Sequence, residues 1–213
     1  HDWLSVQVHP SAEACARLGH GTAKTEAWYV AHAEAGAVLL AGHYPGLDPA
    51  TLRLAAQGGT LRKWLYELAP RPGDMLLVVA GTLHAVGPGF LLLEVQEPSD
   101  TTYRLYDWGR HGLDGQPRPL HVEEAVASLA YERAGPPRAS RHEVAGPRFA
   151  MRIMHTGAET APGPLRVWAA DRGAVLESER GETPLRAGDV VVAETADGVV
   201  RVKSGACLLL SEV

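Results

Sequence analysis

The chain has 213 residues, enough to bury a sizeable core in one domain or in two small ones. Hydrophobic residues make up 46% of it, and 23 glycines with 15 prolines indicate many short elements joined by turns, so we expect a mainly β-protein. The formal net charge is −5 and the lysines and arginines are scattered, which makes nucleic acid an unexpected partner.

Cysteine usage and hydropathy set the expected compartment. Cys15 and Cys207 lie far apart and neither is part of a CxxC pair, so the sequence predicts neither a disulfide framework nor a cysteine zinc site. No apolar run reaches membrane-spanning length, and the first residues lack a basic region followed by an apolar one. We therefore expect a soluble protein in a reducing cytoplasm, with no membrane partner.

The first predicted strand covers residues 4–9, where apolar and polar residues alternate until Pro10 ends it. This alternation places Ser5, Gln7 and His9 on one face. Gln7 and His9 are potential metal ligands, and a rigid strand would present both in the same direction. A polar face in solvent is the alternative interpretation.

Residues 15–25 are predicted to form a polar loop, and residues 27–30 an aromatic and β-branched strand that Glu26 opens. Lys24 and Glu26 would project to one face of this extended segment. If that face also meets the first strand, a carboxylate ligand and a cationic substrate anchor arrive there together. Ordinary surface charge is the alternative.

A helical insertion is expected next. Residues 37–41 read as a short buried strand and residues 42–46 as a turn. Asp48 as N-cap and Pro49 at the first helical position predict a helix that ends at a glycine pair. A second helix is predicted over residues 60–68, where leucines and a tryptophan recur at helical spacing. We interpret the two helices as a cover over the site.

The next segment alternates turns and strands. Residues 71–74 have a turn signature, and His84 follows a second, Gly-Thr turn. Glu94 and Gln96 would share one face of the strand they occupy, with leucines and valine on the other. The expected strands of this part are residues 75–80, 90–95 and 101–106.

Composition divides the rest of the chain. We predict a catalytic domain over residues 1–110, a polar linker over residues 111–138 with a helix at about 122–130, and a C-terminal β domain over residues 139–213. The strands expected in the last domain are residues 142–144, 149–154, 167–170, 174–178, 190–194, 199–202 and 207–210.

One short sequence motif occurs in both halves of the chain. Residues 71–80 (RPGDMLLVVA) and residues 186–193 (RAGDVVVA) both place a charged turn with Gly-Asp before an aliphatic strand. The first copy continues to Gly-Thr-Leu-His, whereas the second continues without a histidine. Two β-barrels of similar plan, one with a metal site and one without, would explain both features.

Four residues form a plausible oxygen and nitrogen ligand set for a divalent ion such as Zn²⁺. Three come from the early strands and one from the Gly-Thr-Leu-His turn. Two histidines, one carboxylate and one amide would leave room for water or substrate, although a single histidine among ten is more often a surface or core residue. The set is Gln7, His9, Glu26 and His84.

Five motifs carry a resemblance to a known family. They are residues 5–10 (SVQVHP), 24–29 (KTEAWY), 72–74 (PGD), 81–85 (GTLHA) and 96–110, the last containing SDTTYRLYD. In this order they resemble the type I mannose-6-phosphate isomerases of the cupin superfamily, in their short bacterial form. The motifs cover most of residues 4–110, whereas the C-terminal half resembles the family mainly in position.

The resemblance implies both a fold and an activity. The fold would be a cupin, a jelly-roll β-barrel with a small helical insertion, followed by a second, metal-free cupin-like β domain. The activity would be a zinc-dependent aldose-ketose isomerase interconverting mannose 6-phosphate and fructose 6-phosphate. It implies one Zn²⁺ per chain and a small-molecule sugar phosphate as substrate; the oligomeric state is not readable from the sequence.

The resemblance also assigns roles. Arg104 matches the family's catalytic arginine, Glu94 an acidic residue of proton transfer, and Lys24 the active-site lysine. Ser5 matches a position associated with the substrate phosphate. The residues that match the metal ligands are Gln7, His9, Glu26 and His84.

The reaction explains why such residues are needed. Proton transfer between C1 and C2 passes through a cis-enediol(ate), whose negative charge a metal ion and the Arg104 guanidinium can stabilise. Glu94 is the candidate base, with a pKa raised by its apolar strand. Lys24 could balance substrate charge or protonate an oxygen, and the sequence leaves both roles open.

One departure from the family bears on activity. Family members carry a substantial segment before the Gln-x-His strand, and this chain shows essentially none of it. We expect either a trimmed or processed piece of a longer protein or a shortened relative with a barrel completed differently. The rival functions are a non-catalytic sugar-phosphate- or metal-binding cupin, and an oxygen-using iron cupin, which Gln7 disfavours because a histidine is usual at its position.

Overall fold

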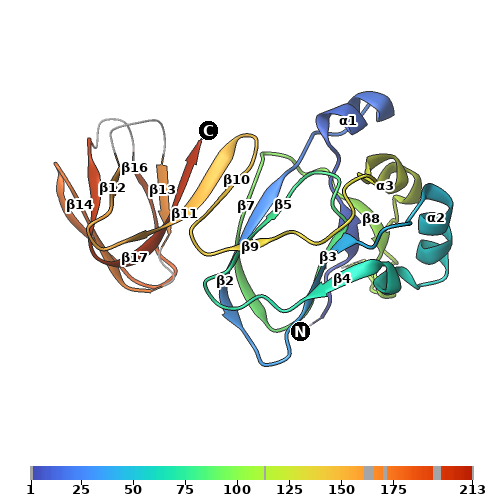
Figure 1. Ribbon diagram of the computed structural model, residues 1–213, viewed down its shortest axis with the longest axis horizontal. Coiled ribbons are helices and arrows are strands. Elements are labelled where there is room, and N and C mark those ends of the chain that lie inside the picture. Colours follow the sequence, from blue (N-terminus) through green and yellow to red (C-terminus); the bar gives the residue numbers. More distant parts are fainter. Residues whose placement is uncertain (1, 113, 161–165, 170–171, 194–197, 213) are drawn as a thin grey trace. The chain divides into compact units, whose positions relative to one another are not determined.

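The computed structural model describes residues 2–112, 114–160, 166–169, 172–193 and 198–212. It divides into two compact units, His1–Ala139 and Ser140–Val213. Both are built mainly from antiparallel strands (Figure 1), which confirms the expected mainly β class.

The first unit contains two sheets. The five-stranded sheet has the order β4 (Leu65–Leu68), β3 (Leu39–His43), β6 (His84–Val86), β1 (Val6–Val8), β8 (Tyr103–Tyr106). The four-stranded sheet has the order β7 (Phe90–Gln96), β2 (Glu26–Ala33), β5 (Met75–Val78), β9 (Ala139–Ser140).

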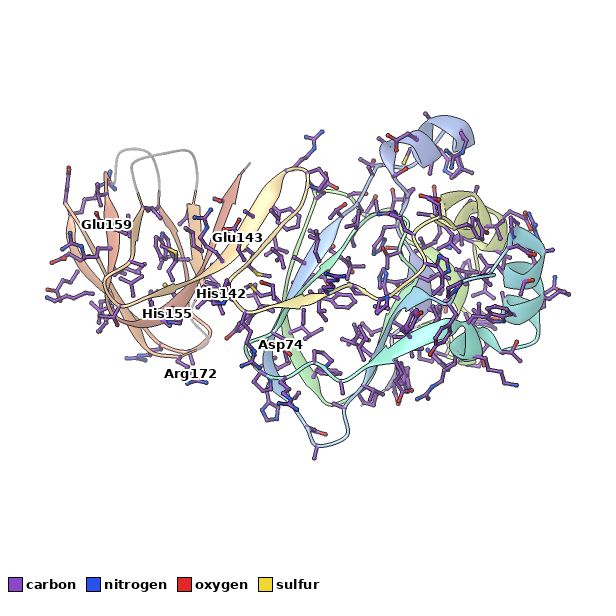
Figure 2. All side chains as sticks on the ribbon, viewed as in Figure 1. Asp74, His142, Glu143, His155, Glu159 and Arg172 are labelled. Atoms are coloured by element: carbon purple, nitrogen blue, oxygen red, sulfur yellow. The ribbon has the colours of Figure 1, made fainter. Side chains whose placement is uncertain are left out.

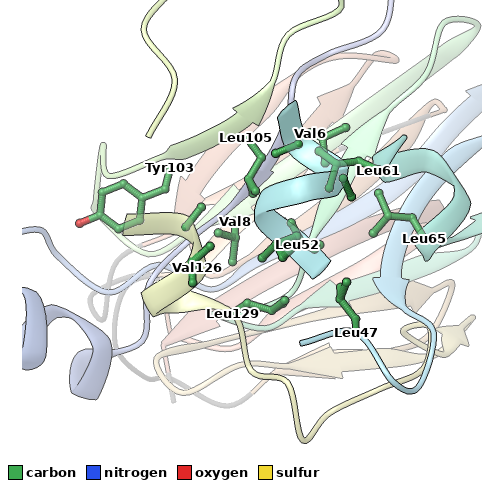
Figure 3. Packing of buried hydrophobic residues seen from close by; sticks show 14 of the residues in the cluster. Val6, Val8, Leu47, Leu52, Leu61, Leu65, Tyr103, Leu105, Val126 and Leu129 are labelled. Carbon is green, nitrogen blue, oxygen red and sulfur yellow. The ribbon is translucent and has the colours of Figure 1, made fainter. Parts of the chain in front are cut away.

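Helices cover the outer face of the five-stranded sheet. Because strand side chains alternate between faces, Val6 and Val8 of β1 point to this side, with Leu105 of β8. They pack against α2 (Pro49–Gln57) and α3 (Val122–Ser128), as the labelled residues of Figure 3 show. None of the described helices is both long and apolar enough to cross a membrane.

The opposite face of this sheet looks toward the four-stranded sheet. Side chains of both sheets meet there in an apolar cluster that includes Trp28 of β2, Leu76 of β5 and Leu39 of β3. The same face carries Gln7 and His84, which are paired directly across β1 and β6. The candidate ligands therefore lie on the inner face, between the sheets.

This arrangement corrects the expected position of the helical insertion. Leu52 of α2 belongs to the outer cluster, together with Val6 and Val8, whereas Gln7 faces the other way. The insertion therefore packs behind the ligand-bearing sheet instead of covering the site. Sequence periodicity shows which side of a helix is buried but not which face of a sheet receives it.

The helix predicted over residues 60–68 is also wrong. Leu61–Trp64 form one short 3₁₀ helix, and the chain then continues as strand β4 paired with β3. Leu61 and Leu65 are both buried in the outer cluster, so their spacing fits the observed turn and strand as well as a helix. Pairing with β3 makes residues 65–68 a strand and not a helix.

Two loops differ from expectation as well. The region predicted as a loop from residue 15 begins inside α1 (Ala12–Leu18), which Ser11 caps at its start and Gly19 in the left-handed region at its end. The turn predicted over residues 42–46 starts later, because Gly42 and His43 belong to β3. A Cβ on Gly42 would lie 2.0 Å from the Gly135 carbonyl oxygen, so glycine is required by close backbone approach.

The helix after Asp48 is confirmed. The Asp48 side chain accepts a hydrogen bond from the Thr51 amide at 2.7 Å, and Pro49 occupies the first turn. The helix predicted over residues 122–130 is α3, and it packs within the first unit, against β8, α1 and α2. His84 follows the turn at residues 80–81, as expected, and opens strand β6.

The second unit is organised around one long strand, β17 (Val200–Glu212). The path is β10 (Glu143–Ala145), β11 (Phe149–His155), β17, β13 (Arg166–Ala169), β16 (Val190–Ala193). The same β17 pairs with β12 (Glu159–Thr160) and with β14 (Ala174–Ser178), whose hairpin partner is β15 (Gly181–Leu185).

β17 joins two strands that the sequence predicts separately, residues 199–202 and 207–210. Gly205 with φ of 79° lies inside it, and its pairing with β14 shifts register between Val175 and Leu176. The polar and glycine residues that suggested a loop are therefore an irregularity within a strand. Residues 170 and 194, the expected ends of two strands, lie outside the described residues.

The motif shared by residues 71–80 and 186–193 forms the same turn in both units. The Arg71 amide donates to Asp74 Oδ2 and the Arg186 amide to Asp189 Oδ2, both at 2.7 Å. Each aspartate amide returns a hydrogen bond to its arginine carbonyl, at 2.9 and 3.0 Å. The glycine before each aspartate has a φ of 92° or 90°. The two turns lead into β5 and β16.

Candidate metal centre

Strand register brings the predicted ligands together. Gln7 pairs with His84 across β1 and β6 and with Arg104 across β1 and β8. Directly opposed residues of antiparallel strands share a face, so the three lie side by side on the inner face. Glu26 opens β2 in the facing sheet, and His9 follows β1 two residues after Gln7.

The four side chains form one contact network. Glu26 Oε2 lies 3.1 Å from His9 Nε2, and Glu26 Oε1 lies 3.3 Å from His84 Nε2. The Gln7 amide nitrogen is 3.1 Å from His84 Nε2. The ligand atoms of His9, Glu26 and His84 all lie within 4.8 Å of one another, and all three residues are buried. This spacing suits donors around a single ion.

Backbone carbonyls fix both imidazoles. His84 Nδ1 lies 2.9 Å from the Thr82 carbonyl oxygen, and His9 Nδ1 lies 3.0 Å from that of Thr101. Since a carbonyl only accepts, each Nδ1 donates the hydrogen, and this leaves each Nε2 facing Glu26. Metal-binding histidines are commonly oriented in this way by a hydrogen bond from the other ring nitrogen.

Charge in the cluster favours a cation. Burial lowers the pKa of His84 to about 4, so its imidazole is neutral at pH 7. Burial raises the pKa of Glu26, but His84, His9 and Lys24 outweigh it and lower that pKa to about 2. An anionic carboxylate therefore faces the neutral imidazole of His84. His9 Nε2 is buried without an aligned hydrogen-bond partner, although it lies 3.1 Å from Glu26, and a bound ion would satisfy it.

Lys24 and Ser5 lie beside the ligands. Lys24 Nζ is 3.5 Å from Glu26 Oε2, and both side chains are buried. The Ser5 hydroxyl donates to Gln7 Oε1 at 2.9 Å. The sequence placed Lys24 on the face of Glu26 and Ser5 on that of Gln7, and the structure brings both to the cluster.

Glu94 reaches the cluster through a tryptophan that sequence reasoning missed. Trp28 Nε1 donates to Glu94 Oε2 at 3.1 Å, and the Trp28 ring meets His84 edge-on with centroids 5.5 Å apart. Burial raises the pKa of Glu94, and the Glu26 charge raises it further, as the sequence led us to expect. Trp28 follows Glu26 by two residues, and that alternation was the available signal.

Arg104 is near but not joined to the cluster. Its Nη1 donates to the Pro119 carbonyl at 3.0 Å, and its Nε is buried without a partner. Among the described residues it makes no hydrogen bond or ion pair with Gln7, Glu26 or Glu94. Burial lowers the pKa of Arg104, and the nearby guanidinium of Arg118 lowers it further.

The second unit shows no comparable group among its described residues. Figure 2 labels His155 on β11 and Glu159 on β12. Glu159 forms an exposed ion pair with Arg201 at 2.8 Å. Across the described part of the chain, a group of three close metal-ligating side chains occurs only in the first unit.

Curated relatives share part of the chain, whereas no protein-family model matches it. A mannose-6-phosphate isomerase of Streptococcus mutans is 40% identical over 129 residues, which are 61% of this chain and 40% of that protein. A probable mannose-6-phosphate isomerase of Bacillus subtilis is 40% identical over 124 residues, 58% of this chain and 39% of that protein. The chain thus matches about two fifths of the length of these relatives.

Solved structures match over the full chain. The crystal structure of mannose 6-phosphate isomerase from Bacillus subtilis has a TM-score of 0.85 and 26% identity, covering 100% of this chain and 72% of that one. A mannose 6-phosphate isomerase bound with zinc and yttrium shares the fold at a TM-score of 0.67 and 16% identity, covering 99% of this chain and 76% of that one. The chain is therefore a homologue of the mannose-6-phosphate isomerases, which confirms the resemblance carried by its motifs.

Proposed function

We propose that this chain provides the catalytic centre of a zinc-dependent aldose-ketose isomerase that interconverts mannose 6-phosphate and fructose 6-phosphate. The cluster of Gln7, His9, Glu26 and His84 carries the proposal, because its two oriented imidazoles converge on a buried carboxylate. The names of the curated relatives supply the substrate.

Zinc fits the donor set better than calcium or magnesium, because two imidazoles are among the four ligands. We assign His9 and His84 through Nε2 and Glu26 through its carboxylate, for one Zn²⁺ per chain. Gln7 would bind through its amide oxygen, after the amide turns over from the orientation in which its nitrogen faces His84. Bound there, the ion would polarise the substrate's oxygens and stabilise negative charge that develops on them. A structural neighbour described as bound with zinc supports this choice.

The residues around the cluster are assigned to proton transfer and to charge stabilisation. We assign Glu94 as the base that moves a proton between C1 and C2 of the sugar through a cis-enediol, since burial raises its pKa and Trp28 links it to the cluster. Trp28 holds the Glu94 carboxylate from one side. Arg104 stabilises the enediolate charge after its side chain turns from Pro119 toward the substrate.

The two smaller roles concern substrate charge. Ser5 contributes a hydroxyl to the substrate phosphate, in exchange for its hydrogen bond to Gln7. Lys24 either balances substrate charge or protonates a sugar oxygen, and its position 3.5 Å from Glu26 is compatible with both.

The proposed architecture also rests on the similarity to the mannose-6-phosphate isomerases. We propose that the first unit is a cupin barrel and the second a metal-free cupin-like domain, supported by the face-to-face sheets and the repeated turn. The proposed division remains residues 1–110, 111–138 and 139–213, with the middle segment as the connection. Cytoplasmic location also stays a prediction.

A coupled assay for fructose 6-phosphate tests the proposal. The complete protein containing this chain should lose activity when the metal is removed with a chelator and regain it when Zn²⁺ is restored. His84→Ala should lose both metal and turnover, whereas His32→Ala, an exposed histidine on β2, should keep both. Arg104→Ala should keep metal and lose rate.

Zinc binding without turnover in the complete protein would contradict the isomerase assignment and favour a non-catalytic sugar-phosphate- or metal-binding cupin. Activity in Arg104→Ala would remove that residue from the mechanism while leaving the metal centre in place.

A further inference from the structure

Two consecutive peptide groups, those of Ala80 and Gly81, hold the segments that carry two of the proposed ligands. The Ala80 amide donates to Thr25 Oγ1 at 3.2 Å, and Thr25 directly precedes Glu26. The Gly81 amide donates to the carbonyl oxygen of His9 at 2.7 Å. One short turn is therefore bonded both to His9 and to the residue before Glu26.

The same turn places the third ligand. The chain passes from Gly81 through Thr82 to His84, and the Thr82 carbonyl oxygen lies 2.9 Å from His84 Nδ1. A shift of the turn would move His84 and change its separation from Glu26, which is 3.3 Å between Nε2 and Oε1. The Ala80–Gly81 turn is thus the common reference for the positions of all three ligands.

Thr25 is itself firmly held. It is 1% exposed, and its amide donates to Glu97 Oε2 at 2.8 Å. Its carbonyl oxygen accepts a hydrogen bond from the Glu97 amide at 3.0 Å. The Thr25 hydroxyl therefore meets the Ala80 amide from a fixed backbone. Without that hydroxyl, a buried amide would lose its acceptor, which is costly.

The outer side of the turn is bound by residues 130–133, which follow α3. The Ala130 amide donates to the Gly81 carbonyl oxygen at 3.0 Å, and Arg133 Nη2 donates to the carbonyl oxygen of Ala80. Arg133 is an exposed residue. Both amides and both carbonyls of the dipeptide are therefore occupied, so the turn cannot tilt without breaking a hydrogen bond.

We propose that Thr25 and Arg133 are positioning residues of the metal centre, acting through the Ala80–Gly81 turn on the separation of its ligands. Neither side chain belongs to the proposed ligands or to the groups assigned to the substrate. Hydrogen bonds outside the ligand set commonly govern metal affinity, because they hold the donor atoms in place before the ion arrives. The inference rests on the proposed function, since the cluster must hold Zn²⁺.

Zinc affinity of the complete protein containing this chain tests the proposal, by competition with a chromogenic chelator. Thr25→Val keeps the shape of the side chain and removes the acceptor, so the dissociation constant for Zn²⁺ should rise at least about tenfold. Thr25→Ser restores the hydroxyl and should bind within about threefold of the native protein, whereas Arg133→Met should bind at least about threefold more weakly than the native protein.

Asp48→Ala is the matched control for stability. It also removes the acceptor of a backbone amide in the first unit, that of Thr51, but at α2 behind the ligand-bearing sheet. It should destabilise the unit and keep native zinc affinity. Co²⁺ loaded in place of Zn²⁺ gives a second readout, because its visible absorption reports the ligand arrangement. That spectrum should change in Thr25→Val and stay native in Asp48→Ala.

The outcomes separate this inference from the proposed function. A native protein that binds no zinc would overturn both. Native zinc affinity and a native cobalt spectrum in folded Thr25→Val would overturn this inference alone, as would an equal loss of affinity in Asp48→Ala. If Thr25→Val does not fold, Arg133→Met decides, because the exposed Arg133 can be replaced without unfolding the chain; native affinity in that variant would overturn the inference.

Discussion

The same turn precedes β5 in the first unit and β16 in the second, but the strands that follow it differ. β5 is paired on both sides, by β2 and β9, and its residues Met75 and Leu76 are buried. β16 is paired on one side in the described chain, and Val190 and Val192 are 57% and 56% exposed. The turn determines how each strand begins, whereas neighbouring strands determine what it buries.

The continuation of the two strands separates the units chemically. After β5 the chain turns at Gly81, whose amide donates to the His9 carbonyl, and enters β6 at His84. That connection sets His84 opposite Gln7. The described part of the second unit has the turn and the aliphatic strand without such a group, so the same turn and strand lead to a ligand cluster only in the first unit.

The largest expected effect comes from breaking the ligand cluster. His84→Ala should lower isomerase activity at least about a hundredfold, because substitutions that only perturb the orientation of a ligand already cost about 10–100-fold. His155→Ala, a change to an exposed histidine of the second unit, should leave activity within about twofold. The coupled assay measures both; similar losses would contradict the division between the units.

The buried ion pairs of Asp107 in the first unit should contribute more to the free energy of unfolding than the exposed ion pair of Glu159 in the second. Asp107 is buried and accepts hydrogen bonds from Arg110 and Arg118. Asp107→Asn should lower the free energy of unfolding of the first unit by about 1.5–3 kcal/mol, the usual contribution of hydrogen bonds to charged groups. Glu159→Gln, which removes only the exposed pair with Arg201, should cause no measurable change in denaturant unfolding.

Much of this site could be predicted, because its ligands lie on strands with clear alternation. Gln7 and His9, and likewise Lys24 and Glu26, are spaced by two residues, which fixes their common face. The carbonyls of Thr82 and Thr101 that orient the imidazoles had no sequence signal, because backbone acceptors are chosen by long-range register.

The fold was less predictable where the same residues fit both a helix and a turn followed by a strand. Leu61, Leu65 and Leu68 suit a helix, yet β3 draws residues 65–68 into its sheet. The side on which α2 packs, opposite to the cluster, depends on how the sheet faces are assigned. Neither choice is encoded in a local pattern.

The repeated turn offers a matched pair of substitutions. Gly73 and Gly188 have φ of 92° and 90°, and a Cβ on either would meet nothing within 4 Å. Gly73→Ala and Gly188→Ala should therefore each destabilise their unit by about 1–2 kcal/mol through backbone strain alone. Urea unfolding of both variants checks this, and clearly unequal costs would show that the turns are not equivalent.

The smallest effect is a pH dependence of the first unit. Burial raises the pKa of Asp107, but hydrogen bonds from Arg118 and Arg110 outweigh it and leave that pKa below its ordinary value. The unfolded chain thus takes up the proton first, so this stabilisation is present above about pH 4 and is lost as the pH falls through the folded pKa. The stability difference between native protein and Asp107→Asn should shrink in acid; a constant difference would exclude this linkage.

X-ray absorption at the zinc edge of the purified protein tests the central claim most directly. One zinc per chain should be found with a shell of nitrogen and oxygen at about 2.0–2.1 Å, including imidazole scattering from His9 and His84, and this signal should disappear in His84→Ala. A sulfur shell at about 2.3 Å, or zinc retained unchanged in His84→Ala, would contradict a metal centre at this cluster.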